Sequence, residues 1–265
     1  MIAYLDAHNH LQDEWLTPYR CEIFEALEKI GIGAAVVNGT NEADWPEVTA
    51  LAQKHSWILP SYGMHPWYLS SRSPDWRERL LEQVSKGKCA IGEIGLDRWK
   101  EPYDLAEQID IFQWQLDLAA ERNLPVTIHC LKAWGALWDI IRRRPVPERG
   151  FLLHSYGGPA EMLGGFIDRG AYFSFPGYFL DPRKEAKRAV FKQIPQDRLL
   201  AETDAPAMPL PPAQIRYPLP DTAAGEPVNH PANIMAVYDG LAELLGLNTD
   251  DLAKILAQNF RRLFG

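Results

Sequence analysis

The chain has 265 residues, with 27 Lys and Arg against 35 Asp and Glu, which gives a formal net charge of −8. Hydrophobic residues make up 46% and charged residues 23% of the chain, so it can bury a large core, and disorder and collagen-like structure are excluded. The negative charge argues against a protein that coats long duplex DNA or an anionic membrane surface. No run approaches the roughly 20 apolar residues of a membrane span, and the N-terminus lacks the basic region of a signal peptide.

Cysteine usage points to a reducing compartment. The chain has three cysteines, Cys21, Cys89 and Cys130, and no two of them are in CxxC spacing. An odd number without a pairing pattern does not indicate a disulfide framework. We therefore expect a cytoplasmic protein with no membrane partner, as a monomer or weak oligomer.

Short apolar runs alternate with amphipathic stretches along the chain, a pattern typical of parallel strands joined by crossover helices. The expected strands are Ala3–His10, Gly33–Gly39, Ile58–Met64, Cys89–Leu96, Pro125–Cys130, Phe151–Ser155, Ala171–Pro176 and Leu199–Asp204. The expected helices lie near Tyr19–Ile30, Asp44–His55, Pro74–Lys86, Asp104–Arg122, Lys132–Arg143, Ala160–Arg169, Asp181–Gln193, Pro231–Leu245 and Thr249–Leu263. This alternation predicts an α/β fold, a (β/α)8 TIM-type barrel in a single domain, residues 1–265; an open doubly wound sheet is the alternative.

One stretch interrupts this alternation. The segment at about 205–230 is rich in proline, which fixes φ and removes a hydrogen-bond donor, so we expect an ordered but irregular loop. Because it follows the last expected strand, in a barrel it would lie over the C-terminal mouth. It is either a wall or lid of an active site or a plain surface connection.

Histidines gather at one edge of the expected sheet. Of the chain's 7 histidines, five lie at or just beyond the C-terminal ends of expected strands: His8, His10, His65, His129 and His154. In a barrel these ends converge on the face where active sites are built. A random scatter of core histidines would not favour that edge.

Two carboxylates join the histidines at the strand ends. In Asp6-Ala7-His8-Asn9-His10 the alternation of a strand would point Asp6, His8 and His10 to one side, where two imidazoles can chelate one ion. Glu93 lies between glycines at the end of the fourth strand, and Asp204 closes the eighth.

Taken singly, each of these residues has an ordinary explanation, such as a hydrogen-bonded core histidine or a solvated charge. Together, four of the histidines and two carboxylates form a mixed N/O ligand set suited to Zn²⁺, Mn²⁺, Fe²⁺ or Mg²⁺. They are His8, His10, His129, His154, Glu93 and Asp204. The set exceeds what one tetrahedral ion needs. It therefore predicts two divalent metal ions, Zn, Mg or Mn, that share a carboxylate.

The order of these motifs resembles the TatD family of metal-dependent hydrolases, which are amidohydrolase-type barrels. The resemblance covers the whole chain and rests on Asp6-x-His8-x-His10, Gly63-Met64-His65-Pro66, Gly92-Glu93-Ile94-Gly95-Leu96-Asp97, the strand-end histidines, Glu202-Thr203-Asp204-Ala205-Pro206 and Asn259-Phe260-Arg261-Arg262-Leu263-Phe264. It implies a distorted barrel that hydrolyses phosphodiester bonds, as a DNase with 3′→5′ exonuclease character.

The resemblance also implies roles for individual residues. One metal ion would be held by His8, His10, Glu93 and Asp204, and the other by Glu93, His129 and His154, with Glu93 bridging. Asp204 and Glu93 would then be the catalytic carboxylates. Glu93 would bridge the two ions, and Asp204 would also orient or deprotonate the attacking water. On the substrate side, His65 would face the phosphate, and Glu202 would act there or from behind the ligands.

Three departures from the family pattern fall on the expected substrate walls. Trp67 stands where a second histidine is usual, Arg98 and Trp99 stand where a tyrosine is usual, and the proline-rich stretch with Asn229-His230-Pro231 replaces a familiar segment. Trp67 and Trp99 either stack a base or line a small-molecule pocket.

The sequence thus favours a metal-dependent hydrolase in which a metal-activated water attacks an ester, with a single-stranded DNA end or a small phosphodiester as substrate. Hydrolysis of a small ester, lactone or amide is the first alternative, and a catalytically silent binding module is the second. Two bound cations would make the mouth locally positive, and Arg98 and Arg216 would add to that if they face it.

Overall fold

The computed structural model describes residues 2–265, in which eight parallel strands form one sheet in chain order. The strands are β1 (Tyr4–Asn9), β2 (Ile32–Asn38), β3 (Ile58–Tyr62), β4 (Ala90–Asp97), β5 (Val126–Leu131), β6 (Phe151–Leu153), β7 (Ala171–Pro176) and β8 (Leu199–Glu202). Every expected strand is present, which confirms the barrel over the open doubly wound sheet. Two strands end early: β6 stops at Leu153 and β8 at Glu202, so His154 and Asp204 lie in the loops that follow.

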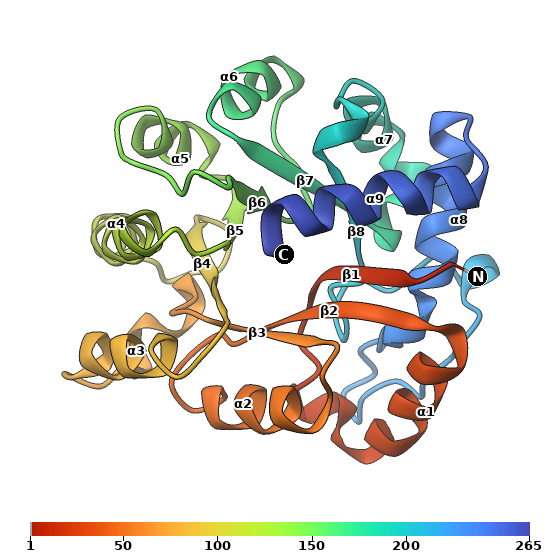
Figure 1. Ribbon diagram of the computed structural model, residues 1–265, viewed down its shortest axis with the longest axis horizontal. Coiled ribbons are helices and arrows are strands. Elements are labelled where there is room, and N and C mark those ends of the chain that lie inside the picture. The colour runs from red at the N-terminus through yellow and green to blue at the C-terminus, as the bar shows by residue number, and fades with distance from the viewer. Residues whose placement is uncertain (1) are drawn as a thin grey trace.

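Helices surround the strands, as Figure 1 shows. They are α1 (Arg20–Ile30), α2 (Trp45–Lys54), α3 (Trp76–Val84), α4 (Leu105–Arg122), α5 (Trp134–Ile141), α6 (Leu163–Asp168), α7 (Glu185–Phe191), α8 (Ile234–Leu245) and α9 (Thr249–Phe264). Short 3₁₀ turns, including η1 (Glu14–Tyr19) and η2 (Pro66–Ser71), were not expected from the sequence. Among the described residues, no helix combines the length and the apolar character needed to cross a membrane.

The barrel is distorted where its first and last strands meet. Regular parallel pairing runs from β1 to β8, and the remaining junction is closed by individual hydrogen bonds. The Asp204 N–H donates to the His8 carbonyl at 3.0 Å, and the His10 N–H donates to the Ala205 carbonyl at 2.8 Å. The Asp6 carboxylate bridges the same junction, because it accepts hydrogen bonds from the Thr203 N–H (3.0 Å) and hydroxyl (2.6 Å). This junction places the end of β1 directly beside the residues that follow β8.

The barrel interior is filled by packed side chains at the end that α9 covers. Small and branched residues of the strands, such as Ala7 and Val36, pack with Phe260, Leu263 and Phe264 of α9. In Figure 1, α9 crosses this end of the barrel with the C-terminus near its centre. Because α9 covers the N-terminal ends of the strands, the C-terminal mouth is the end available for a site.

The proline-rich segment is tied to the end of β8. The Asn229 side chain donates to the Thr203 carbonyl at 2.8 Å and to the Met208 carbonyl at 3.3 Å. Leu210 and Val228 of the segment are buried in the core. The segment is therefore an ordered irregular connection that begins at the mouth.

Candidate metal centre

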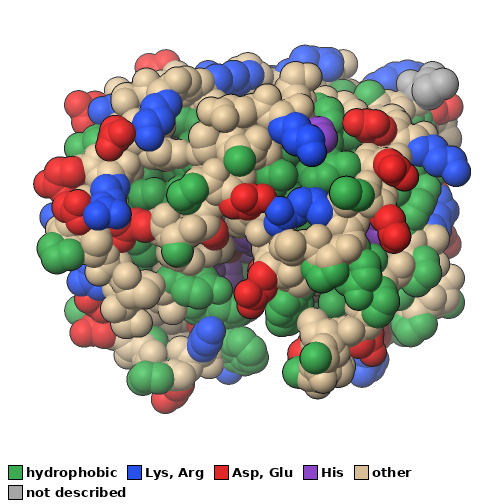
Figure 2. All heavy atoms as spheres, turned by 90° about the horizontal axis from the view of Figure 1, so that it is seen from below, with side chains coloured by type: hydrophobic (Ala, Val, Ile, Leu, Met, Phe, Trp, Pro, Cys, Tyr) green, Lys and Arg blue, Asp and Glu red, His purple; other side chains and the backbone are tan. Residues whose placement is uncertain are grey.

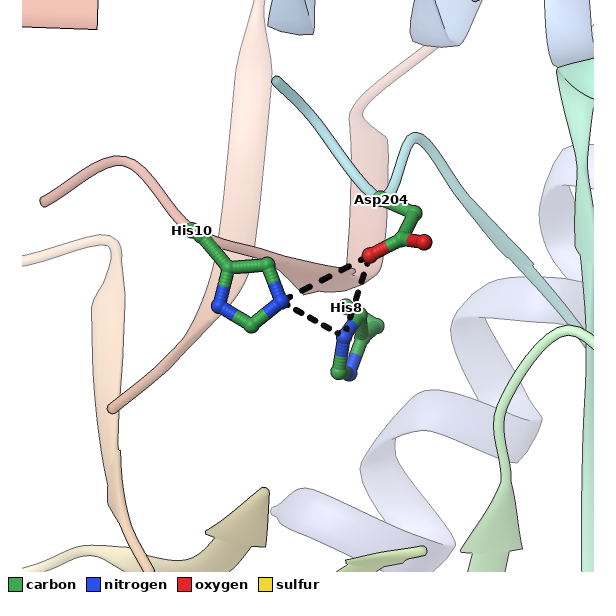
Figure 3. A group of neighbouring side chains, drawn as sticks. All are labelled: His8, His10 and Asp204. Carbon is green, nitrogen blue, oxygen red and sulfur yellow. Dashed lines mark hydrogen bonds and ion pairs between the residues drawn. The ribbon is translucent and has the colours of Figure 1, made fainter. Parts of the chain in front are cut away.

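The ends of β1 and β8 bring two histidines and an aspartate together (Figure 3). The His8 and His10 Nε2 atoms lie 3.2 Å apart. Asp204 Oδ1 lies 3.3 Å from His8 Nε2 and 3.5 Å from His10 Nε2. Glu93, from β4, places Oε2 at 3.5 Å and 3.3 Å from the same two nitrogens. These four side chains enclose a first group of ligand atoms.

The other oxygen of Glu93 faces a second group. Glu93 Oε1 lies 2.8 Å from His154 Nε2 and 3.1 Å from His129 Nδ1. His65 adds its Nε2 at 3.5 Å from the same oxygen. The rings of His8 and His154 stack with centroids 4.0 Å apart, which joins the two groups. A single carboxylate therefore lies between two sets of imidazoles.

Outer hydrogen bonds decide which ring nitrogens face the centre. His10 Nδ1 lies 2.7 Å from the Asn38 carbonyl oxygen, which only accepts, so this nitrogen carries the proton and Nε2 offers its lone pair. His129 Nε2 lies 2.8 Å from Asp97 Oδ2, which leaves Nδ1 to face Glu93 and His154. Such outer partners are how metal-binding histidines are oriented.

The donor set fits divalent metal ions. Imidazole nitrogens whose lone pairs point at one another across 3.2 Å repel without an ion or a proton between them, and this holds for the pair of His8 and His10. The same holds for His129 and His154, also 3.2 Å apart. Buried nitrogens and carboxylate oxygens converging in this way suit Zn²⁺, Mn²⁺ or Fe²⁺.

Mutual attraction within the cluster sets its protonation. Burial alone would raise the pKa of Glu93, but the surrounding imidazoles, His154 above all, hold it well below its usual range. Asp204 behaves in the same way: burial opposes ionisation, and His10 and His8 lower its pKa. Both carboxylates are therefore anionic near neutral pH, as metal ligands need to be. In contrast, burial lowers the pKa of His65 to about 4, so this imidazole is neutral.

Two acidic residues named from the sequence lie behind the ligands. Asp6, which was expected to share a side with His8 and His10, directs its carboxylate to Thr203 at the junction of β1 and β8. Glu202 is fully buried and accepts hydrogen bonds from the hydroxyls of Ser155 and Ser174, with Oε1 3.7 Å from His154 Nδ1. This burial favours a position behind the cluster, next to His154, over direct contact between Glu202 and a substrate.

The wall residues lie at the mouth beside His65 and His129. The Trp67 ring centroid is 5.1 Å from that of His65 and 5.9 Å from that of His129. Trp99 lies next to Trp67, and Arg98 is exposed at the end of β4. The expectation that Arg216 adds positive charge at the mouth is not met, because its guanidinium pairs with Asp239 of α8 at 2.6 Å. Figure 2 shows a cleft opening at the lower edge of the molecule with histidine atoms visible inside it.

Sequence reasoning missed the residues that orient the clustered side chains. Asp97, Asn38, Ser155 and Ser174 were given no role, although Asp97 belongs to the motif around Glu93. The available signal for Asp97 was its position at the end of an apolar, glycine-containing strand, in the same motif as Glu93. The other three contacts depend on the fold and leave no pattern in spacing.

Comparison with known proteins identifies the class. The family described as TatD related DNase matches residues 5–265. The metal-dependent hydrolase YjjV of Escherichia coli (strain K12) is 29% identical over 270 residues, covering 100% of this chain and 98% of that protein. The protein named 3'-5' ssDNA/RNA exonuclease TatD of Erwinia tasmaniensis is 32% identical over 248 residues, covering 92% of this chain and 93% of that protein.

Solved structures agree with these relatives. The crystal structure of the E. coli YjjV TatD homologue matches with a TM-score of 0.88 and 28% identity over 98% of this chain and 97% of that one. A TatD family protein of Entamoeba histolytica, 18% identical, shares the fold with a TM-score of 0.83. The chain is thus a metal-dependent hydrolase of the nuclease type. It belongs to the TatD family.

Proposed function

We propose that this chain holds two divalent metal ions and hydrolyses phosphodiester bonds at single-stranded nucleic-acid ends in the 3′→5′ direction. The observation that carries the proposal is the position of Glu93, whose two carboxylate oxygens face two separate imidazole groups. His8, His10 and Asp204 would complete one ion's ligands with Glu93 Oε2. His129 and His154 would complete the other's with Glu93 Oε1.

The chemistry that such ions supply when bound is a water of lowered pKa and neutralisation of charge on the phosphoryl oxygen. The chain's own residues do the rest. Asp204 uses Oδ1 toward the histidines, and its other oxygen points away from them in Figure 3, free to accept a proton from the attacking water. His65, as a neutral imidazole, donates a hydrogen bond to a substrate oxygen. Asn38 and Asp97 keep His10 and His129 in the tautomers that this arrangement needs.

Support for a nucleic-acid strand as substrate comes from the relatives and the wall. The Erwinia protein is named for single-stranded DNA and RNA, and the wall of this chain carries Trp67, Trp99 and Arg98 at the cluster. Aromatic rings and a cation suit a base and a phosphate together. We assign these three residues, with His65, to substrate binding.

The test is digestion of an end-labelled single-stranded oligonucleotide by metal-loaded protein, with Mg²⁺, Mn²⁺ and Zn²⁺ compared. We expect mononucleotides released from the 3′ end, and no turnover by Asp204→Ala protein whose circular dichroism matches the wild type. The control is Asp110→Ala, an exposed carboxylate of α4, which should retain activity. Cleavage of carboxylate esters or lactones without cleavage of the oligonucleotide would overturn the substrate, and an active Asp204→Ala protein would overturn the mechanism.

We also propose that residues 1–265 act as one domain, as a monomer or weak oligomer in the cytoplasm. Continuous packing of α9 across the barrel supports the first point, and three unpaired cysteines, Cys21, Cys89 and Cys130, suit a reducing compartment. A single cooperative unfolding transition, light scattering and cell fractionation test these three statements.

A further inference from the structure

The wall beside His65 and His129 carries a pair of indoles. The Trp67 and Trp99 ring centroids lie 6.1 Å apart with 36° between the ring planes. The Trp99 side chain is far more open than its neighbour: the residue is 55% exposed, the largest exposed fraction among the exposed large hydrophobic residues. Trp67 is partly buried between Trp99 and the two histidines. One indole therefore backs onto the cluster, and the other offers an open face.

A hydrogen-bonded turn holds this open indole in a defined place. Asp97 Oδ1 accepts the N–H groups of Trp99 at 2.6 Å and Lys100 at 3.0 Å. The other oxygen of the same carboxylate binds His129. The turn that carries Trp99 is thus anchored to a side chain of the cluster, and a group placed on the indole would stand at a fixed position relative to the cluster.

Unpaired cations accompany the indoles. Lys100 Nζ lies 4.4 Å from the Trp67 ring centroid, in cation–π geometry. Among residues 2–265, no ion pair includes Arg98, Lys100 or Lys132. The Arg98 N–H donates to the Leu131 carbonyl, so Arg98 and Lys132 lie just beyond the ends of the neighbouring strands β4 and β5. The loop between β4 and α4 also carries two exposed carboxylates, Glu101 and Asp104, of which Asp104 caps the N-terminus of α4. The surface around Trp99 combines a flat apolar face with positive charge.

We propose that Trp99 is a platform on which an unpaired nucleobase stacks, with the adjoining backbone phosphate against Lys100. The proposal rests on the proposed function and names the residue that selects a base-bearing strand. A small ester or lactone would need an enclosing pocket, whereas this indole is more than half exposed. An uncharged apolar protein surface would leave the cations Arg98, Lys100 and Lys132 without a counter-charge. A base with its phosphate satisfies both the open ring and the charge.

The experiment measures binding and not turnover. Full-length protein with its metal is titrated against a short oligothymidylate that carries a dye at its 5′ end and a phosphorothioate at its 3′-terminal linkage, and a gel confirms that the strand stays intact. The same titration uses strands in which the terminal or the penultimate base is removed. Loss of one stacked base weakens binding by roughly tenfold, so Trp99→Ala should weaken binding of the complete strand by about that factor.

Three comparisons decide the outcome. The effect of Trp99→Ala should vanish on one of the strands lacking a base, and Trp99→Phe should restore most of the affinity for the complete strand. Lys100→Gln should weaken binding of all strands, whereas Lys54→Gln, an exposed lysine at the end of α2, should not. Equal weakening of complete and base-free strands by Trp99→Ala, or no weakening at all, would overturn the platform.

The two proposals fail differently. If the wild-type protein binds and cleaves the strand but Trp99→Ala shows no dependence on the base, the platform is wrong and the proposed function stands. If the wild-type protein neither binds nor cleaves the strand, the proposed function fails and the platform falls with it.

Discussion

Asp97 lies behind the proposed ligands and fixes one of them. Its Oδ2 holds the Nε2 proton of His129, and its Oδ1 accepts two backbone N–H groups from the turn that follows β4. Burial alone would raise the pKa of Asp97, but His129 and these N–H groups hold it below its usual range. The carboxylate is therefore ionised and fixed at both oxygens, and it keeps His129 Nδ1 directed at Glu93.

Replacing Asp97 should weaken metal binding without removing a ligand. Loss of an outer partner of a ligating histidine typically costs 10–100-fold in metal affinity, and we expect Asp97→Ala to fall in that range, about tenfold or more. Chelator competition measures the change. Asp110→Ala is the control, because that carboxylate is exposed and pairs only with Arg77. Unchanged metal affinity in Asp97→Ala protein would show that His129 is oriented by packing alone.

At the scale of elements, the close approach of β4 to β5 depends on the absence of a side chain at Gly95. A Cβ on Gly95 would lie 1.9 Å from the carbonyl oxygen of His129 in β5, so β4 and β5 can approach only where glycine stands. The approach brings Glu93 and His129 within 3.1 Å. The glycine therefore positions two proposed ligands.

We expect Gly95→Ala to destabilise the protein strongly, by about 3 kcal/mol or more, because backbone must move to admit the methyl group. Gly135→Ala is the matched control: a Cβ there meets nothing within 4 Å, and helix α5 should gain up to about 1 kcal/mol from alanine. Urea unfolding of the three proteins measures both changes. A Gly95→Ala protein as stable as the wild type would mean that the two strands can separate at no cost.

The end of the proline-rich segment is fixed by a neutral histidine. His230 Nδ1 accepts the Ala232 N–H at 2.9 Å and so begins the 3₁₀ turn Pro231–Asn233. Burial lowers the pKa of His230 to about 4, below the usual 6.5. A lowered pKa means that the neutral form is favoured by folding, so His230 contributes stability above about pH 6.5 and loses it as pH falls toward 4.

His230→Asn removes this titration and keeps a side-chain acceptor for the turn. The free energy of unfolding of the wild type, relative to that of His230→Asn, should fall by about 2 kcal/mol between neutral pH and about pH 5. Urea titrations of both proteins at the two pH values measure the difference. A difference that stays constant with pH would contradict a neutral, buried His230.

The order of elements could be predicted because buried parallel strands are continuous apolar runs. The clustering of the histidines could be predicted because histidines such as His129 end such runs. Strand ends were less predictable: β6 and β8 stop before His154 and Asp204, where backbone leaves the ladder with positive φ at Ser155 and Asp204. Partners across the fold, such as Asn38 for His10, have no signature in spacing. The expectation that Arg216 adds charge at the mouth failed for the same reason, because its partner Asp239 lies on α8 and meets it only in the folded chain.

At the scale of the whole molecule, the net charge of −8 and a nucleic-acid substrate are compatible if charge is unevenly spread. Many surface cations are paired with carboxylates, as Arg72 is with Glu107 and Arg20 with Glu47. Arg98, Lys100 and Lys132 at the mouth form no ion pair among residues 2–265. Long duplex DNA would meet a net negative surface over most of the molecule, whereas a strand end would meet these cations first.

This distribution predicts a small but measurable salt dependence. Each phosphate neutralised on a single strand contributes a slope of about −0.7 in a plot of log affinity against log salt, so three cations predict a slope of about −2. Arg98→Gln should reduce the slope by about 0.7 if its guanidinium meets a phosphate. Arg216→Gln is the matched control, since that guanidinium is held by Asp239 and should not change the slope. Closed circular duplex DNA, which has no ends, should not bind at physiological salt; tight binding of it, or a slope unaffected by Arg98→Gln, would mean that the charge at the mouth does not guide the strand.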